Sequence, residues 1–150
     1  MENRTQTIEE LNDILERNYD SVAGYEKAAE NVKNSRLKNY LTREMIARKE
    51  FIKELAAEVL NLGGTPKSSG TIEGTFHRAW IDFKSAISFE NDESVLEACI
   101  TGEAFCLKEY SDLLEEKHLP ESTRRLLSKQ KEDINVSLRT LEIKEERIDE

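Results

Sequence analysis

Four polar residues interrupt stretches that are otherwise apolar at helical spacing: Asn18, Glu44, Glu103 and Gln130. Carboxylate oxygens at such inward positions are ligands that hard cations accept. Glu26 and Asp133 border the same stretches and extend the set of oxygen donors. A cluster of this kind has no imidazole and would bind iron poorly. One interpretation is therefore a metal site built from carboxylates alone: Glu26, Glu44, Glu103 and Asp133.

A buried hydrogen-bonded layer is the other interpretation of these positions, and we favour it. Such layers fix the register of packed helices. Amide side chains can satisfy carboxylate lone pairs, and Tyr25 and Tyr110 are further donors. Arg48 follows Glu44 by four residues, so the two side chains can pair on one helical face. We expect no catalytic or cofactor-binding residue, and a structural layer formed by Asn18, Glu44, Arg48, Glu103 and Gln130.

Long amphipathic helices are the elements that would position these side chains. The chain of 150 residues has only two Pro and six Gly, and 35% of its residues are charged, which is typical of helices. A capping-box pattern from Thr7 to Glu10 predicts the first helix start, and Gly63-Gly64 predicts the end of the second helix. We expect one all-α domain over residues 1–150, with helices over about 7–33, 35–62, 92–117 and 121–146 and a helical crossover over 72–88.

The two halves of the sequence resemble each other. A shift of 85 residues places Leu11 on Leu96 and Tyr25 on Tyr110. This repeat predicts two equivalent helical hairpins. The connection between them is far longer than antiparallel neighbours need, so it can run the length of the bundle and make the second and third helices parallel.

The crossover segment carries a family resemblance. Its sequence from Gly74 to Lys84, Gly-Thr-Phe-His-Arg-Ala-Trp-Ile-Asp-Phe-Lys, follows Leu62-Gly-Gly-Thr-Pro66. Together with the helical stretches from about residue 8 to 142, it resembles an uncharacterised bacterial four-helix-bundle family, a domain of unknown function in the ferritin-like superfamily. The resemblance implies a ferritin-like four-helix bundle and supplies no substrate. We expect the crossover to dock through hydrogen bonds and aromatic packing of His77, Arg78, Trp80, Asp82 and Lys84.

The resemblance to the ferritin-like superfamily also implies a di-iron site, whose ligand pattern can be compared with this sequence. Its di-iron sites take one Glu from each of two helices and a Glu-x-x-His pair from each of the others. Here Ala47 and Asp133 stand where the two His would be. The resemblance therefore implies a bundle without an intact di-iron site, a non-enzymatic structural or stress-associated protein that acts through protein contacts. The alternative is an iron-binding ferritin-like protein or oxidase with a carboxylate-only site.

Charge and hydropathy argue against two classes of binding partner, nucleic acids and membranes. The net charge of −9 and the pI near 4.9 give a surface that repels phosphate, so we expect no nucleic-acid partner. No apolar run approaches the roughly 20 residues of a membrane span, and the N-terminus lacks a signal-peptide pattern. We expect an acidic, cytoplasmic protein with no membrane partner and no required cofactor. A homo-oligomer is left open. Cys99 and Cys106 suit a core, and His118 is expected to be exposed.

Overall fold

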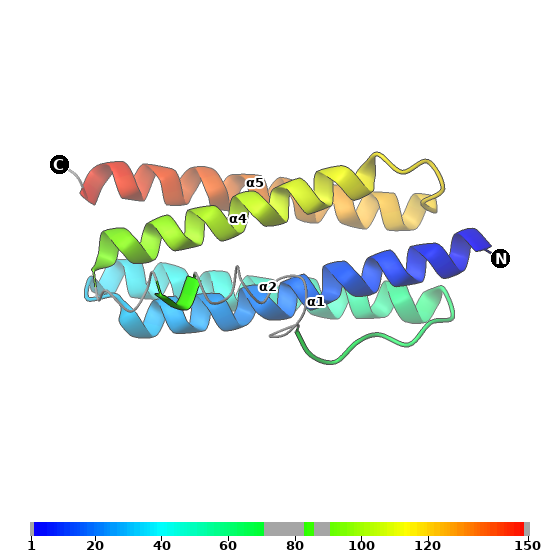
Figure 1. Ribbon diagram of the computed structural model, residues 1–150, viewed down its shortest axis with the longest axis horizontal. Coiled ribbons are helices and arrows are strands. Elements are labelled where there is room, and N and C mark those ends of the chain that lie inside the picture. The colour runs from blue at the N-terminus through cyan, green and yellow to red at the C-terminus, as the bar shows by residue number, and fades with distance from the viewer. Residues whose placement is uncertain (1, 71–82, 86–90, 149–150) are drawn as a thin grey trace.

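The computed structural model describes residues 2–70, 83–85 and 91–148. These residues form four long helices: α1 (Glu2–Asn31), α2 (Ser35–Asn61), α4 (Asp92–Leu114) and α5 (Glu121–Ile148). Residues 83–85 are also helical, and no strand occurs in the described ranges (Figure 1). The prediction of an all-helical class is therefore confirmed.

Local capping residues determine two of the helix starts. The Asn34 side chain accepts a hydrogen bond from Leu37 N at 3.0 Å and caps α2. The Asn91 side chain accepts from Ser94 N at 3.2 Å and caps α4 in the same way. Each cap satisfies a backbone N–H that has no partner inside its own helix.

The start of α1 differs from the prediction. The helix begins at Glu2, and Thr7 lies buried inside it. The Thr7 hydroxyl donates to the carbonyl oxygen of Asn3 at 2.8 Å, one turn earlier in the same helix. A hydroxyl engaged in this way cannot cap, because it bonds backward to a carbonyl and not forward to an N–H. The capping-box pattern at Thr7 was thus misleading.

The four helices pack as two antiparallel hairpins. Asp92, at the start of α4, accepts from the backbone N–H groups of Lys33 and Asn34 at 2.8 and 3.1 Å, so α4 begins beside the α1–α2 turn. Glu58, near the end of α2, accepts from Ser122 and Thr123 at the start of α5. The end of α2 and the start of α4 therefore lie at opposite ends of the molecule, and these helices run in the same direction (Figure 1).

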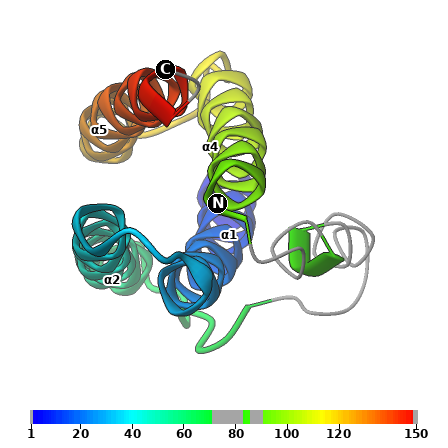
Figure 2. The same cartoon turned by 90° about the vertical axis from the view of Figure 1, so that its left-hand side faces the viewer.

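Seen end-on, α1 lies beside α2 and α4, and α5 lies beside α4 (Figure 2). Residues 83–85 lie outside this group of helices, on the side of α1 and α4. The loop after α2 docks on α1 through Asn12, whose side chain donates to Thr65 O at 3.1 Å and accepts from Lys67 N at 2.9 Å. Gly63 closes α2 with a φ of +87°, a conformation that favours glycine.

The apolar core consists of two separate clusters. The larger one surrounds Leu15, Leu55 and Leu127, all of them fully buried. The other surrounds Leu41 and Leu96, near the α1–α2 turn. Buried polar residues of three helices lie between the clusters along the chain: Asn18, Arg48 and Glu103. The buried Gln130 of α5 lies between Leu127 and Ile134, which both belong to the larger cluster.

Candidate functional site

The buried polar residues Asn18, Arg48, Glu103, Tyr110 and Gln130 form what we call the polar centre. Each of the four helices contributes at least one of them. None has more than 2% of its surface exposed. A buried polar group is costly unless it is hydrogen-bonded or paired, so the contacts of this centre determine what it can do.

An ion pair between Arg48 and Glu103 joins α2 to α4 in this centre. Burial raises the pKa of Glu103, and Arg48 opposes this effect. Burial is the largest effect on Arg48 and acts to lower its pKa, but the attraction of Glu103 and of neighbouring tyrosine and cysteine side chains together outweighs it, and the net pKa is raised. The guanidinium lies over the Phe51 ring, with 5.0 Å between Cζ and the ring centroid. Arg48 thus remains a cation and balances the Glu103 carboxylate.

A chain of hydrogen bonds through Tyr110 joins the remaining members. Asn18 Nδ2 donates to the Tyr110 hydroxyl at 2.9 Å, and that hydroxyl donates to Gln130 Oε1 at 2.7 Å. Gln130 Nε2 then donates to Glu54 Oε1 at 3.1 Å. The chain therefore connects α1, α4, α5 and α2 in turn. The sequence placed Asn18, Gln130 and Tyr110 together as layer members, but it did not predict that the tyrosine would link the two amides.

Glu44 lies at the edge of the polar centre and is only partly buried. Its carboxylate accepts a hydrogen bond from Ser137 Oγ on α5 at 2.9 Å. The expected pairing of Glu44 with Arg48 along one helical face is not found, because the Arg48 side chain turns inward to Glu103. A buried guanidinium gains more from a fully desolvated carboxylate than from one at a partly solvated edge.

The four proposed metal ligands are not all brought together. Glu26 and Asp133 are exposed, whereas Glu103 is buried. Across the described ranges, no group of three or more His, Cys, Asp or Glu side chains could hold a metal ion. The donor set also fits a di-iron group poorly, because the Arg48 cation already engages Glu103 and would repel a second cation.

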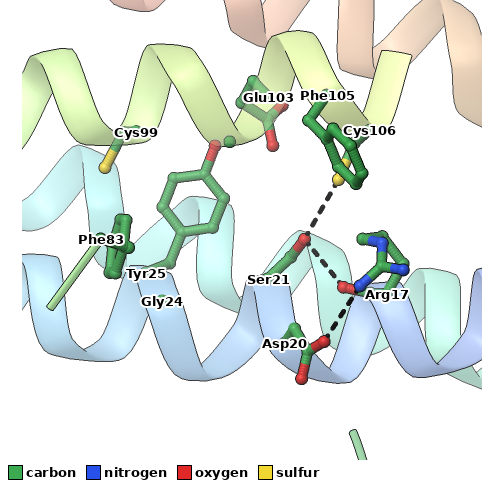
Figure 3. Close-up of a pocket in the computed structure, with 11 residues that line it drawn as sticks. Arg17, Asp20, Ser21, Gly24, Tyr25, Phe83, Cys99, Glu103, Phe105 and Cys106 are labelled. Carbon is green, nitrogen blue, oxygen red and sulfur yellow. Dashed lines mark hydrogen bonds and ion pairs between the residues drawn. The ribbon is translucent and has the colours of Figure 1, made fainter. Parts of the chain in front are cut away.

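A cavity of about 120 Å³ lies between α1 and α4, beside the polar centre (Figure 3). Tyr25, Glu103 and Phe105 line it, and so do the thiols of Cys99 and Cys106. Sequence reasoning placed both cysteines in the core, which is confirmed, but it missed the cavity. Burial raises the pKa of the Cys106 thiol to about 11, so this thiol stays protonated at neutral pH.

The two histidines and the crossover residues complete the predicted set. His118 was expected to be exposed, but only 12% of its side chain is accessible, and its Nε2 lies 2.6 Å from Glu10 Oε1 on α1. Of the predicted crossover residues, Lys84 is described and exposed. The other four lie outside the described residues: His77, Arg78, Trp80 and Asp82.

The fold and site define an all-helical protein with an ion-paired polar centre. Residues 6–116 match the family described as a domain of unknown function (DUF2383), and the chain belongs to that family. The match spans α1, α2 and α4 and ends before α5. No curated protein matches the chain. In the described ranges, no helix is long and apolar enough to cross a membrane.

Proposed function

We propose that this chain is a ferritin-like bundle in which the Arg48–Glu103 ion pair stands in place of a di-iron centre, and that it acts through protein contacts and not as an enzyme. The ion pair is the observation that carries the proposal. In this account the polar centre holds four helices in register, and the function lies on the surface. A structural or stress-associated role is consistent with such a scaffold.

The composition of the polar centre supports this proposal. Ferritin-like metal sites draw carboxylates and imidazoles from all four helices. Here each helix also contributes a central polar side chain, but two of the four are the amides Asn18 and Gln130. The remaining two, Arg48 and Glu103, carry opposite charges that cancel. A centre that is already neutral has little electrostatic attraction for a metal dication.

The topology supports the ferritin-like part of the proposal. The α2 and α4 helices run in the same direction, so the connection between them must span the length of the molecule. The corresponding tyrosines of the two halves, Tyr25 and Tyr110, are both buried. One long connection between two hairpins is the arrangement of ferritin-like bundles.

Metal content measured by mass spectrometry tests the proposal. The untagged protein would be loaded anaerobically with ferrous iron, desalted and compared with Glu44→Ala, Glu103→Ala and the exposed control Glu26→Ala. We expect background iron in all four proteins and no consumption of hydrogen peroxide. About two irons per chain in the wild type, lost in Glu44→Ala and Glu103→Ala but kept in Glu26→Ala, would refute the proposal.

A further inference from the structure

We propose that the cavity between α1 and α4 binds a small neutral aromatic molecule that carries one hydroxyl group, a ligand of the phenol class. This site goes beyond the proposed scaffold function and does not depend on it. The cavity shares Glu103 with the polar centre, but its other walls are distinct from that centre. Size, wall chemistry, charge and one unsatisfied hydroxyl lead to this ligand class.

The volume suits a single aromatic ring. The cavity measures about 120 Å³, and an apolar protein cavity of about 150 Å³ holds a benzene molecule. Its walls include the rings of Phe83 and Phe105 and the sulfur atoms of Cys99 and Cys106. Sulfur and aromatic edges attract an aromatic guest. Phe105 is 40% exposed and provides a rim through which a ligand can enter.

The charges at the cavity favour a neutral ligand. Arg17 pairs with Glu109 and with Asp20 at 3.1 Å, and Glu103 pairs with Arg48. An anionic ligand would face carboxylates that already engage these cations. A cationic ligand would have to separate a buried ion pair, which costs several kcal/mol. A neutral molecule leaves every one of these pairs intact.

Tyr25 supplies the polar contact. Its side chain is 4% exposed, and its hydroxyl makes no hydrogen bond of ordinary geometry. Figure 3 shows the ring extending from α1 toward Glu103 on α4. The hydroxyl is near enough to lower the pKa of Glu103, but it keeps unused hydrogen-bonding capacity. Because burial raises the pKa of Tyr25, this hydroxyl stays protonated, and its oxygen can accept a hydrogen bond from a ligand hydroxyl.

Gly102 leaves the cavity open on the side of α4. A glycine inside a helix costs about 1 kcal/mol relative to alanine. A Cβ atom at Gly102 would meet no other atom within 4 Å, so packing does not require glycine here. Gly24 lines the same cavity from α1. Two helix-interior glycines thus line the cavity, one on each helix.

Calorimetric titration of the full chain with phenol and with toluene tests the site. We expect both probes to bind the wild type. Tyr25→Phe should weaken phenol binding about tenfold, the value of one hydrogen bond, and change toluene binding less than about twofold. Tyr40→Phe is the matched control, because Tyr40 also has an unsatisfied hydroxyl but does not line the cavity. It should change neither affinity.

Filling the cavity gives a second test. Gly102→Leu adds a side chain that favours helix and should weaken the binding of both probes at least tenfold. Absence of phenol binding to the wild type would overturn the proposal. Equal loss of phenol and toluene binding in Tyr25→Phe would overturn the role of the hydroxyl, and unchanged binding in Gly102→Leu would place the ligand elsewhere. None of these results depends on iron content, so a failure here is distinct from a failure of the proposed function.

Discussion

Tyr110 is the residue that links most of the polar centre. Its hydroxyl accepts from Asn18 and donates to Gln130, and both contacts are shorter than 3.0 Å. Asn18 Nδ2 has a second acceptor in the Ile14 carbonyl at 2.9 Å. Gln130 Oε1 is less well supported, since its described donor is Tyr110. Loss of the hydroxyl would therefore affect Gln130 more than Asn18.

Replacing Tyr110 with Phe should destabilise the protein by about 1–3 kcal/mol, because a buried amide oxygen loses its hydrogen-bond donor. Chemical denaturation of the variant and the wild type measures this difference. Tyr40→Phe removes a hydroxyl that has no hydrogen-bond partner of ordinary geometry, and it should be nearly neutral. Similar losses in both variants would show that the hydrogen-bond chain does not matter for stability.

Glu103 should make the stability depend on pH. Burial raises its pKa above the usual 4.5 in the folded protein, although Arg48 opposes the shift. A raised pKa contributes stability that is complete below the unfolded-state pKa and is lost as the pH rises through the folded-state pKa. The free energy of unfolding of the wild type, relative to Glu103→Gln, should therefore fall as the pH rises from 4.5.

Chemical denaturation of the wild type and of Glu103→Gln, from pH 4.5 upward, measures how their difference in stability depends on pH. The difference in stability between the wild type and Tyr110→Phe is a suitable comparison, since both proteins keep Glu103 and burial raises the pKa of Tyr110 further from this range. This difference should not depend on pH. A wild-type stability that rises with pH relative to Glu103→Gln would mean that the attraction of Arg48 outweighs the effect of burial.

At the residue scale, the periodicity of the sequence predicts which residues face the core. It does not predict the ion-pair or hydrogen-bond partner of each residue. The spacing of apolar residues was enough to group Asn18, Glu103 and Gln130 in one layer. It could not show that Arg48 pairs across to α4 and not along α2 to Glu44, because that choice depends on how two helices are aligned in space. Glu26 and Asp133 border the same apolar stretches in the sequence, but both side chains are exposed in the fold.

Contacts between elements determine where some helices begin. Glu58 on α2 is 6% exposed and accepts from the hydroxyls of Ser122 and Thr123 at 2.8 and 2.6 Å. Thr123 is fully buried. One carboxylate therefore holds the first turn of α5 against the last turns of α2.

Replacing Glu58 with Ala should cost about 1–3 kcal/mol, because the buried Thr123 hydroxyl loses its acceptor. Hydrogen exchange should show faster opening of the first turn of α5, while the centre of α4 stays protected. The control Glu50→Ala removes an exposed carboxylate of α2 whose ion pair with Lys53 spans 3.9 Å, and it should leave both quantities unchanged. An unaltered α5 start in Glu58→Ala would contradict this role.

Helix boundaries were predictable where the cause is local. Asn34 and Asn91 cap the helices that directly follow them, so their roles could be read from neighbouring residues. The end of α4 at Leu114 comes before the predicted residue 117. Arg124 of α5 donates to the Leu114 carbonyl at 2.6 Å, and this contact comes from another helix. The pattern of apolar residues within α4 cannot predict a contact that another helix makes.

At the scale of the whole molecule, the arrangement of the four helices follows from the internal repeat and from the long connection between the two hairpins. Two hairpins with α2 and α4 running in the same direction are what the sequence predicted. The cavity was not predicted, because it depends on the spacing between α1 and α4. Gly24 and Gly102 were the available signal, since helix-interior glycines need a packing or functional reason.

A double-mutant cycle on Arg48 and Glu103 is the most direct test of the claim that an ion pair holds the centre. Arg48→Met and Glu103→Gln should each cost about 3–5 kcal/mol, because each leaves a buried group without its partner. The double variant should lose less than the sum of the two. Single costs that simply add would contradict the pairing. Stabilisation of Arg48→Met by added ferrous iron would show that the centre is a metal site from which the guanidinium excludes the ion.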